Sequence, residues 1–323
     1  MSSILVTGAA GFIGHAVCLR LAAQGAELLA VDSFDSYYEP ALKRDRAAQL
    51  AAVGVAVQSL DIADHESLAE LAARARVTRA VHLAAQAGVR HSIVAPFAYQ
   101  HSNLAGHLSV LECCRRLPDF DHLVYASSSS VYGDRPADGA RFREDDRVDH
   151  PASLYAATKR SGELMSECYA GLYGIPQSGL RFFTVYGPWG RPDMAYFSFT
   201  RRIIAGEEIE IFGEGRMRRD FTYIDDIVDG VLGVLDRPPV PGTHRLLNLG
   251  NDRPEPLLGF VSLLEQAIGR EARMVMRPMQ AGDVTETWAD IGRISALTGY
   301  APRTPLAEGL PRFVAWYRDR YGV

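Results

Sequence analysis

The sequence predicts an α/β fold in which a doubly wound parallel sheet is interleaved with a smaller C-terminal lobe. Three observations support this prediction. Short aliphatic runs alternate with helix-period segments through the first 250 residues, a glycine-rich turn joins the first run to the first helix, and Gly- and Pro-rich pieces interrupt the pattern after about residue 183. Strands that are buried on both faces are continuous aliphatic runs, so this alternation predicts βαβ units around a buried parallel sheet.

Seven short runs rich in aliphatic residues are expected to be the strands. They are Ile4–Thr7, Glu27–Val31, Val55–Leu60, Ala80–Leu83, His122–Ala126, Gln177–Phe182 and Leu246–Leu249. Segments between them have apolar residues spaced three or four apart, which predicts amphipathic helices at His15–Gln24, Glu66–Arg74, Ala105–Arg116 and Tyr155–Tyr173. Strands and helices therefore alternate in the order that a doubly wound sheet requires.

Composition and charge exclude several classes of protein. With 323 residues and 47% hydrophobic content, the chain can bury a large core. The net charge is −5 with acidic and basic residues interspersed, which predicts no binding to nucleic acid or to an anionic membrane. No apolar run approaches the length of a membrane span, and Ile4–Val6 does not resemble a signal peptide. The cysteines at positions 18, 113, 114 and 168 form no CxxC pair, which predicts a cytoplasmic protein with reduced thiols and no metal site.

A glycine-rich turn follows the first expected strand. Gly8, Gly11 and Gly14 are spaced three apart, with Phe12 and Ile13 at the start of the helix. Glycines permit a tight turn and a close backbone approach, and free N–H groups at a helix start attract phosphates. A glycine triplet alone is a weak signal, but its position between strand and helix predicts a Rossmann-type dinucleotide site.

Two acidic residues at the ends of later strands are candidate cofactor ligands. Asp32 lies eighteen residues after Gly14, where an acid accepts hydrogen bonds from the adenosine ribose and repels a 2′-phosphate. The expected cofactor is therefore NAD rather than NADP, although Asp32 also suits a turn that only ends the strand. Asp61, followed by Ile62, is expected to face the adenine, and the alternative for Asp61 is a helix cap.

Tyr155 and Lys159 are a candidate catalytic pair, because a four-residue spacing puts both side chains on one face of a helix. A tyrosine with a pKa of about 10 is a poor base at neutral pH, but an adjacent ammonium and a positive nicotinamide ring stabilise its phenolate. Lys159 is also expected to hold the nicotinamide ribose. Taken alone, this spacing more often marks a solvated helix face.

A run of serines supplies a third catalytic candidate. Ser127–Ser130 directly follows the expected strand His122–Ala126, and ligands bind at the carboxyl ends of strands in a doubly wound sheet. A hydroxyl there, at Ser128, can share the substrate proton with Tyr155. The alternative is a polar serine-rich loop, but the glycine turn, the serines and the Tyr155–Lys159 pair occur in the chain order of a single site.

Together these motifs resemble the extended short-chain dehydrogenase/reductase family, in its nucleotide-sugar epimerase and dehydratase branch. The resemblance runs from Ile4 to Gly322 and includes His82-Leu-Ala-Ala-Gln86, Arg181-Phe-Phe-Thr-Val-Tyr-Gly-Pro188, Arg219-Asp-Phe-Thr-Tyr-Ile-Asp-Asp226 and Gly282-Asp283. Within this branch, Val31–Lys43, Ala87–Arg90 and Pro188–Ala195 resemble the UDP-glucuronate 4-epimerases. Ser33 and Ala281 depart from the family pattern, which has asparagine and proline at these places.

The resemblance implies a role for each matching residue. Tyr155 is the catalytic base, Ser128 is its hydroxyl partner, and Lys159 is the tuning and ribose-binding cation. The residues expected to bind NAD are Gly8, Gly11, Phe12, Ile13, Gly14, Asp32, Ser33, Lys43, Asp61, Ile62, Leu83, Ala84 and Ala85, together with Tyr155 and Lys159. The residues expected to bind a UDP-sugar are Arg90, Ser128, Ser129, Thr184, Arg191, Ile211, Phe212, Arg219 and Asp283.

The parts of the UDP-sugar are assigned to different residues by the same resemblance. Thr184 and Arg191 bind the sugar carboxylate, and an arginine can hold a carboxylate in a two-pronged fork. Arg219 meets the diphosphate and Asp283 the uridine ribose, while the strand Ile209–Phe212 lies beside the uracil. Arg90 is a contact from the substrate loop rather than a catalytic group.

The chain is expected to divide into two lobes. Residues 1–182 plus about 225–250 form a NAD-binding Rossmann domain, and about 183–224 plus 251–323 form a nucleotide-sugar-binding lobe. The resemblance also implies a homodimer in which the helices Ala105–Arg116 and Tyr155–Tyr173 pair with their copies. The alternative is that their apolar faces are covered within one chain.

The implied reaction is C4 epimerisation of UDP-glucuronic acid to UDP-galacturonic acid through a 4-keto sugar, with tightly bound NAD. Ser129 and Ser130 replace the Asp-Glu pair of the 4,6-dehydratases, and Ser130 replaces the glutamate of the uronate decarboxylases. Thr184 stands where asparagine is the commoner residue, which argues mildly against the first alternative, a UDP-glucose/UDP-galactose 4-epimerase. The alternative without catalysis is a NAD-sensing scaffold.

Overall fold

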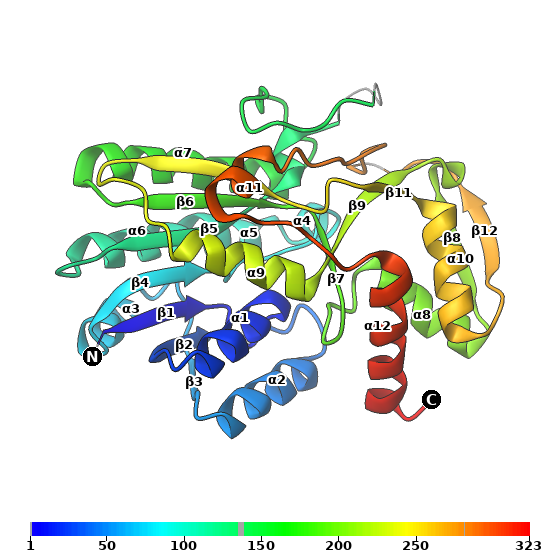
Figure 1. Ribbon diagram of the computed structural model, residues 1–323, viewed down its shortest axis with the longest axis horizontal. Helices are drawn as coiled ribbons and strands as arrows, with labels where there is room; N and C mark the ends of the chain where they lie inside the picture. Colours follow the sequence, from blue (N-terminus) through cyan, green and yellow to red (C-terminus); the bar gives the residue numbers. More distant parts are fainter. Residues whose placement is uncertain (1, 135–138, 281) are drawn as a thin grey trace.

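A seven-stranded parallel sheet forms the centre of the protein (Figure 1). The computed structural model describes residues 2–134, 139–280 and 282–323, so Ala281 lies outside the described part. The strand order is β10-β6-β5-β4-β1-β2-β3, and every neighbouring pair is parallel. The chain changes direction across the sheet between β1 and β4, where a doubly wound sheet binds its ligand. The predicted fold class is confirmed.

All of the predicted strands are present, although some of their ends differ by one to three residues. The strands span Ser3–Thr7 (β1), Leu28–Asp32 (β2), Val57–Ser59 (β3), Val77–His82 (β4), His122–Ser128 (β5), Gln177–Phe182 (β6) and His244–Leu249 (β10). Strand residues such as Leu5, Val6 and Val81 are fully buried. Burial on both faces of the sheet explains why these strands are continuous apolar runs in the sequence.

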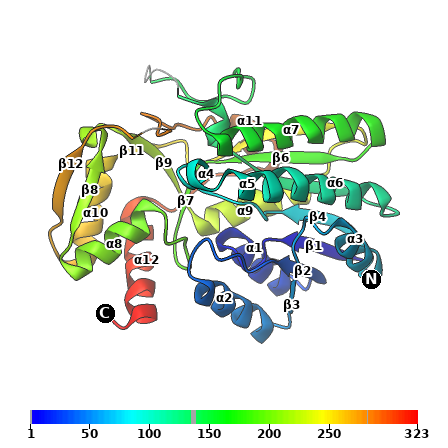
Figure 2. The same ribbon diagram turned by 180° about the vertical axis from the view of Figure 1, so that it is seen from behind.

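Helices cover both faces of the sheet (Figures 1 and 2). On one face α1 packs against α9, α2 and α11 pack beside these two, and on the other face α3, α6 and α7 lie in a row. The predicted helices are confirmed in α1, α3, α6 and α7. The bounds are Phe12–Ala23 (α1), Pro40–Ala52 (α2), His65–Arg74 (α3), Gly106–Arg116 (α6), Leu154–Tyr173 (α7), Ile224–Leu235 (α9) and Gly292–Thr298 (α11).

The helix α2 is absent from the sequence prediction. Lys43 and Arg46 occupy buried positions of this helix, where an amphipathic pattern would have apolar residues. Because two charged side chains interrupt the apolar stripe, the segment does not show the periodicity on which helix prediction depends. Both side chains have partners near the site described below.

Shorter elements form a second region beside the carboxyl ends of the sheet strands, on the right in Figure 1. This region holds a three-stranded sheet, β11-β9-β7, and a two-stranded sheet, β12-β8. Its elements are Thr184–Tyr186 (β7), Ala195–Ala205 (α8), Glu208–Phe212 (β8), Arg218–Tyr223 (β9), Pro254–Pro256 (β11), Leu257–Ile268 (α10), Arg273–Arg277 (β12) and Leu306–Tyr321 (α12). The division of the chain into two lobes at the expected boundaries stays a prediction.

Short helical turns connect several of these elements. They are His91–Val94 (α4), Pro96–Tyr99 (α5), the π-helix Gln100–Ala105 and the 3₁₀ turns Ser129–Tyr132 and Gly213–Gly215. The first three lead from the end of β4 into α6, and the turn Ser129–Tyr132 directly follows β5. These connections therefore lie at the edge of the sheet where ligands bind.

A buried ion pair fixes α7 against the sheet. Glu163 on α7 and Arg181 on β6 are almost completely buried, with 2.8 Å between Arg181 Nε and Glu163 Oε1. Ser127 donates to the same carboxylate oxygen at 2.6 Å. Because removing either partner would leave a buried charge without compensation, the pair holds α7 in one rotation about its axis. The rotation of α7 sets the direction of the side chains on its first turns.

The outer faces of α6 and α7 carry exposed apolar side chains. Leu108 on α6 is 41% exposed, and Leu164 and Leu172 on α7 are 55% and 67% exposed. These three leucines are therefore left exposed, whereas other apolar residues of α6, such as Val110 and Leu111, are covered within the chain. Within the described ranges, no helix has the length and apolar character that crossing a membrane requires. The homodimer stays a prediction.

We expect Leu164→Glu to convert the homodimer into a monomer, because the seam would bury a charge that has no partner. Size-exclusion chromatography with light scattering measures the mass of each variant. The matched control is Leu258→Glu on α10, a leucine of 42% exposure outside α6 and α7. A wild-type monomer, or a Leu164→Glu protein that remains dimeric, would contradict the expected seam.

Candidate active site

A cavity of about 670 Å³ lies where the carboxyl ends of the sheet strands face the smaller region. Every residue that the sequence analysis assigns to NAD or to the UDP-sugar lines it, except Ile211. The lining includes Gly8, Gly11, Phe12, Ile13, Gly14, Asp32, Ser33, Lys43, Asp61, Ile62, Leu83, Ala84, Ala85, Arg90, Ser128, Ser129, Tyr155, Lys159, Thr184, Arg191, Phe212, Arg219 and Asp283. The fold thus brings together residues that are up to 275 positions apart in the sequence.

The side chain of Ile211 does not line the cavity, and a contact of this residue with substrate stays a prediction. Glu210 and Phe212 line the cavity, whereas Ile209 and Ile211 are fully buried in the hydrophobic core. Successive side chains of a strand point to opposite faces, so Ile211 cannot share the direction of Phe212. Only the alternate residues of β8 are available to a ligand.

The glycine turn is packed too closely for any side chain. Gly8 has a φ of 70°, and a Cβ there would lie 2.7 Å from the backbone nitrogen of Ala84. A Cβ at Gly14 would lie 2.0 Å from the carbonyl oxygen of Gly8. The turn therefore lies against both the β4 loop and α1, and the first N–H groups of α1 are left for an anion.

Asp32 ends β2 and also lines the cavity. Its Oδ2 accepts the backbone N–H of Ala10 at 3.0 Å, and its Oδ1 accepts that of Phe34 at 2.8 Å. The carboxylate therefore both stabilises the turn after the strand and connects it to the glycine turn. Each carboxylate oxygen has a further lone pair for a ribose hydroxyl.

Asp61 is not the cap of the helix that follows it. The carboxylate of Asp64 caps α3 by accepting the N–H of Ser67 at 3.2 Å. The carboxylate of Asp61 instead accepts the N–H of Ala63 at 2.9 Å and lies 2.8 Å from Nε2 of His101. The helix-cap alternative for Asp61 is therefore wrong, and its contact with an adenine stays a prediction.

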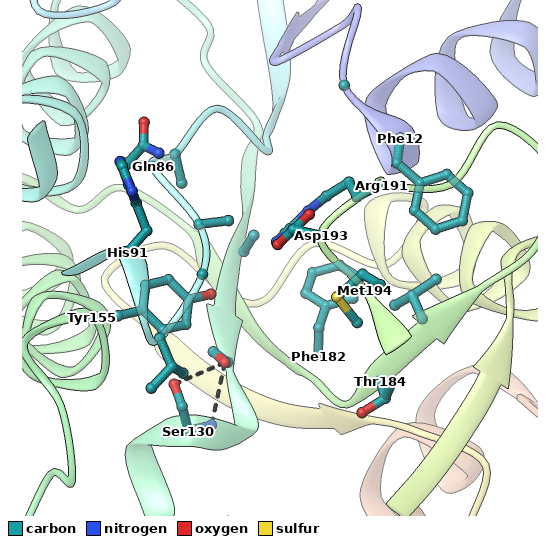
Figure 3. A pocket seen from close by; sticks show the side chains of 18 of the residues that line it. Phe12, Gln86, His91, Ser130, Tyr155, Phe182, Thr184, Arg191, Asp193 and Met194 are labelled. Carbon is teal, nitrogen blue, oxygen red and sulfur yellow. Dashed lines mark hydrogen bonds and ion pairs between the residues drawn. The ribbon is translucent and has the colours of Figure 1, made fainter. Parts of the chain in front are cut away.

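Tyr155 lies on the first turn of α7 at the wall of the cavity (Figure 3). Burial raises the pKa of its phenol, while a hydrogen bond with Ser128 and the charge of Arg191 lower it, and Asp193 raises it. A hydrogen bond that lowers the pKa of a phenol is one that stabilises the phenolate. Ser128 lines the same cavity as Tyr155, and we expect its hydroxyl to donate to the phenol.

Ser128 is held for this donation by its own neighbours. Its Oγ accepts the backbone N–H of Ser130 at 3.2 Å and the hydroxyl of Ser130 at 2.9 Å, the dashed contacts of Figure 3. With two donors at its oxygen, the proton of the Ser128 hydroxyl is free for Tyr155. Ser127 and Ser128 therefore end β5, and Ser129 and Ser130 begin the 3₁₀ turn that Ser128 caps, so the serines are not an irregular loop.

Lys159 lies one turn after Tyr155 and also lines the cavity, as the four-residue spacing predicts. Its Nζ donates to the carbonyl of Ala126 at 2.8 Å. Burial lowers the pKa of Lys159 to about 8, with Glu163 opposing this change. The tuning of Tyr155 by Lys159 stays a prediction.

Arg191 projects into the cavity together with Asp193 (Figure 3). Nε and Nη2 of Arg191 donate to the two carboxylate oxygens of Asp193 at 3.1 and 2.5 Å. The hydroxyl of Tyr37 donates to the same carboxylate at 3.1 Å. Thr184 also lines the cavity, at the start of β7. Sequence reasoning missed Asp193 and Tyr37, although both lie in segments that carry the family resemblance.

Other charged residues in the lining of the cavity also contact their neighbours. Arg90 Nη2 lies 3.0 Å from Asp283 Oδ2, and its guanidinium lies 5.3 Å from the centre of the Phe212 ring. Arg219 donates to the carbonyls of Val284 and Thr285 at 2.6 and 3.2 Å. Residues expected to bind the uridine and the diphosphate are thus neighbours, and their roles stay predictions.

Comparison with known proteins identifies relatives of this chain in sequence and in structure. Residues 4–250 match the NAD dependent epimerase/dehydratase family. UDP-glucuronate 4-epimerase 3 of Arabidopsis thaliana is 46% identical over 99% of this chain and 77% of its own length. A crystal structure of UDP-glucuronic acid 4-epimerase from Bacillus cereus, in complex with UDP-glucuronic acid and NAD, is 33% identical with a TM-score of 0.91, over 99% of this chain and 100% of that one. A structure of UDP-glucose 4-epimerase with UDP-glucose from Thermotoga maritima is 28% identical with a TM-score of 0.87, over 99% of each chain.

The chain belongs to the NAD-dependent epimerase/dehydratase family. Its cofactor is NAD, as in the structural neighbours that hold NAD. The described residues fit this cofactor. The glycine turn has no room for side chains, so its backbone can lie directly beside a pyrophosphate. Asp32 lies where the ribose hydroxyls are expected. The recognition of the family from sequence motifs is confirmed.

Sequence reasoning also missed the buried Arg46 on α2. Its guanidinium donates to the carbonyls of Trp189 at 2.5 Å, Gly190 at 3.1 Å and Ala10 at 3.0 Å, and to the hydroxyl of Tyr38 at 2.7 Å. Arg46 therefore ties the loop that carries Arg191 to the glycine turn. The sequence analysis assigns no role to Arg46, and only its burial shows this function.

We expect Arg46→Met to lower the free energy of unfolding by about 3 kcal/mol, because buried carbonyl groups would lose their donor. Urea unfolding followed by circular dichroism measures this loss. The control is Arg44→Met on the same helix, where the side chain is exposed. Equal stability of the two variants would show that the bonds of Arg46 contribute little.

Proposed function

We propose that this enzyme epimerises UDP-glucuronic acid at C4 and so produces UDP-galacturonic acid through a transient 4-keto sugar. The observation that carries the proposal is the position of Arg191, whose guanidinium lies in the cavity close enough to Tyr155 to lower the pKa of its phenol. In a uronic acid the carboxylate is attached to C5, directly beside the reacting C4. Within one cavity, Tyr155 can act as a base on the C4 hydroxyl while Arg191 binds the neighbouring carboxylate.

The relatives support the same substrate. The proteins from Arabidopsis thaliana and Bacillus cereus that are named above carry the name of this reaction, and they match nearly the whole chain. Ser129 and Ser130 line the cavity where the resembled dehydratases have an acidic pair, which disfavours elimination of water. The structure also gives each catalytic candidate a place in one cavity, which disfavours a non-catalytic scaffold.

In the proposed reaction Tyr155 accepts the proton of the C4 hydroxyl, while the hydroxyl of Ser128 donates to the phenolate. Bound NAD supplies a reversible hydride acceptor. Thr184 and Arg191 bind the carboxylate of the sugar. They keep the bond between this carboxylate and C5 out of alignment with the π system of the C4 keto group, the alignment in which carbon dioxide would be lost. Tyr155 then returns the proton after the sugar has turned over, and no net redox change results.

One observation favours a second candidate function. Because Arg191 already has Asp193 as a counter-ion, the pair is close to neutral and does not exclude a neutral sugar. The activity of UDP-glucose/UDP-galactose 4-epimerase therefore remains the alternative, and the structure from Thermotoga maritima carries that name.

The test is direct incubation of the purified protein with UDP-glucuronate, and in parallel with UDP-glucose. Chromatography of the products separates the C4 epimers of each sugar. We expect interconversion of the uronates to be at least about a hundredfold faster, the discrimination that a site built for a polar group commonly reaches. Faster conversion of UDP-glucose would establish the alternative, and no conversion of either would overturn the proposed activity.

A further inference from the structure

Among the residues that the structure describes, the guanidinium of Arg191 has hydrogen-bond partners along one of its edges. Nε and Nη2 meet the two oxygens of Asp193 in a two-pronged contact at 3.1 and 2.5 Å. An arginine has five N–H groups in a rigid plane, so this contact leaves the Nη1 end and one proton of Nη2 for a second acceptor. The edge of the Arg191 guanidinium that binds Asp193 therefore fixes the direction of the opposite edge.

Asp193 is itself held in place. The hydroxyl of Tyr37 donates to its Oδ2 at 3.1 Å. The ring of Tyr37 packs against His91, with 4.5 Å between the ring centres, and its hydroxyl would lie 2.4 Å from a Cβ at Gly88. These contacts restrict the movement of Tyr37, and its hydroxyl therefore helps to hold the carboxylate of Asp193 in place.

These contacts join the two sides of the cavity. Tyr37 follows β2, the strand that ends at Asp32 on the cofactor side, whereas Asp193 follows β7 on the side of the smaller region. His91 comes from the segment after β4. Loops from distant parts of the chain therefore converge on the guanidinium of Arg191.

We propose that Asp193, supported by Tyr37, is a positioning residue that turns the free end of the Arg191 guanidinium toward the sugar carboxylate. This inference rests on the proposed function, in which Arg191 binds that carboxylate. Asp193 itself does not contact the sugar. A guanidinium that keeps its charge but loses its orientation still attracts the uronate, yet it no longer fixes the plane of the carboxylate.

The variant Asp193→Asn separates orientation from attraction. We expect its kcat for C4 epimerisation to fall about tenfold or more, as misplacement of a binding group commonly costs, while its KM for UDP-glucuronate stays within about twofold of the wild type. The share of decarboxylated pentose product should rise, because the carboxylate can reach alignment with the keto group. Tyr37→Phe should also lower kcat and raise the share of pentose product, each by less than Asp193→Asn does. It replaces Asp193→Asn as the test if that variant fails to fold.

The matched control is Asp229→Asn, which removes the same charge from an exposed ion pair with Arg20 outside the cavity. It should leave kcat, KM and the product ratio unchanged. An Asp193→Asn protein with unchanged kcat and product ratio would overturn the inference. Tighter binding of UDP-glucuronate at unchanged kcat would also overturn it, since Asp193 would then only compete with the substrate for Arg191.

A second measurement does not depend on the substrate. The Nε–H signal of Arg191 in a ¹⁵N-edited NMR spectrum, assigned by its loss in Arg191→Lys, should be protected from exchange with water in the wild type and exposed in Asp193→Asn. An equally protected signal in both proteins overturns the positioning role. If the wild type fails to interconvert the uronates, the proposed function is wrong, and the Nε–H signal still decides whether Asp193 orients Arg191.

Discussion

Replacing Tyr155 by phenylalanine should lower the rate of epimerisation by about 10³, within the range that general acid–base catalysis by one side chain contributes. The substitution removes only the hydroxyl of the phenol, and Ser128 would remain in place beside the ring. The rate is measured by chromatography of the two epimers after timed incubation with UDP-glucuronate.

The folded Tyr155→Phe protein should retain its NAD and its melting temperature, because the substitution leaves the ring and the glycine turn intact. The matched control is Tyr317→Phe on α12, which removes a phenol hydroxyl outside the cavity. An unchanged rate in Tyr155→Phe would contradict the assignment of the base. A protein that loses NAD would show that the substitution acts through the cofactor rather than through proton transfer.

Replacing Arg191 by alanine should lower kcat/KM for UDP-glucuronate by about a hundredfold or more, the usual cost of truncating one partner of a buried charged contact. The 4-keto form of a uronic acid is a β-keto acid, which loses carbon dioxide when the carboxyl bond aligns with the keto group. Without the arginine, we expect the share of pentose product to rise. Chromatography gives the ratio of pentose to hexuronate in the same assay.

The substitution also leaves Asp193 without its counter-ion, so a loss of stability must be separated from a loss of substrate binding. Arg216→Ala provides the comparison, since Arg216 forms an exposed ion pair with Glu214 outside the cavity. Arg191→Lys keeps the charge but not the planar fork, and it should rescue affinity better than it rescues the product ratio. Unchanged turnover and product ratio in Arg191→Ala would defeat the role of Arg191 in substrate binding.

The contrast between α2 and α7 shows where sequence reasoning succeeds. In α7 the spacing of Tyr155 and Lys159 is a local property of a helix, so both side chains could be placed on one face before any tertiary contact was known. In α2 the buried charge of Arg46 has its partners more than a hundred residues away, in the loop at Trp189 and Gly190. No local pattern records such a partner.

The strand β8 gives a second example. The sequence places Ile211 and Phe212 together beside the ligand, but two neighbours on one strand cannot both face one cavity. Which of them faces it depends on how β8 pairs with β12 and packs on the core, which is a tertiary property. Only the structure assigned Phe212 to the cavity and Ile211 to the interior.

The sequence by itself determined the order of strands and helices, the glycine turn, Asp32, the serines after β5 and the spacing of Tyr155 and Lys159. Each of these features depends on the backbone geometry of a few neighbouring residues. This local geometry does not depend on how the rest of the chain packs. The structure alone decided that Tyr37 and Arg46 contact the loop that carries Arg191 and Asp193, because hydrogen bonds between distant segments depend on how the whole chain packs.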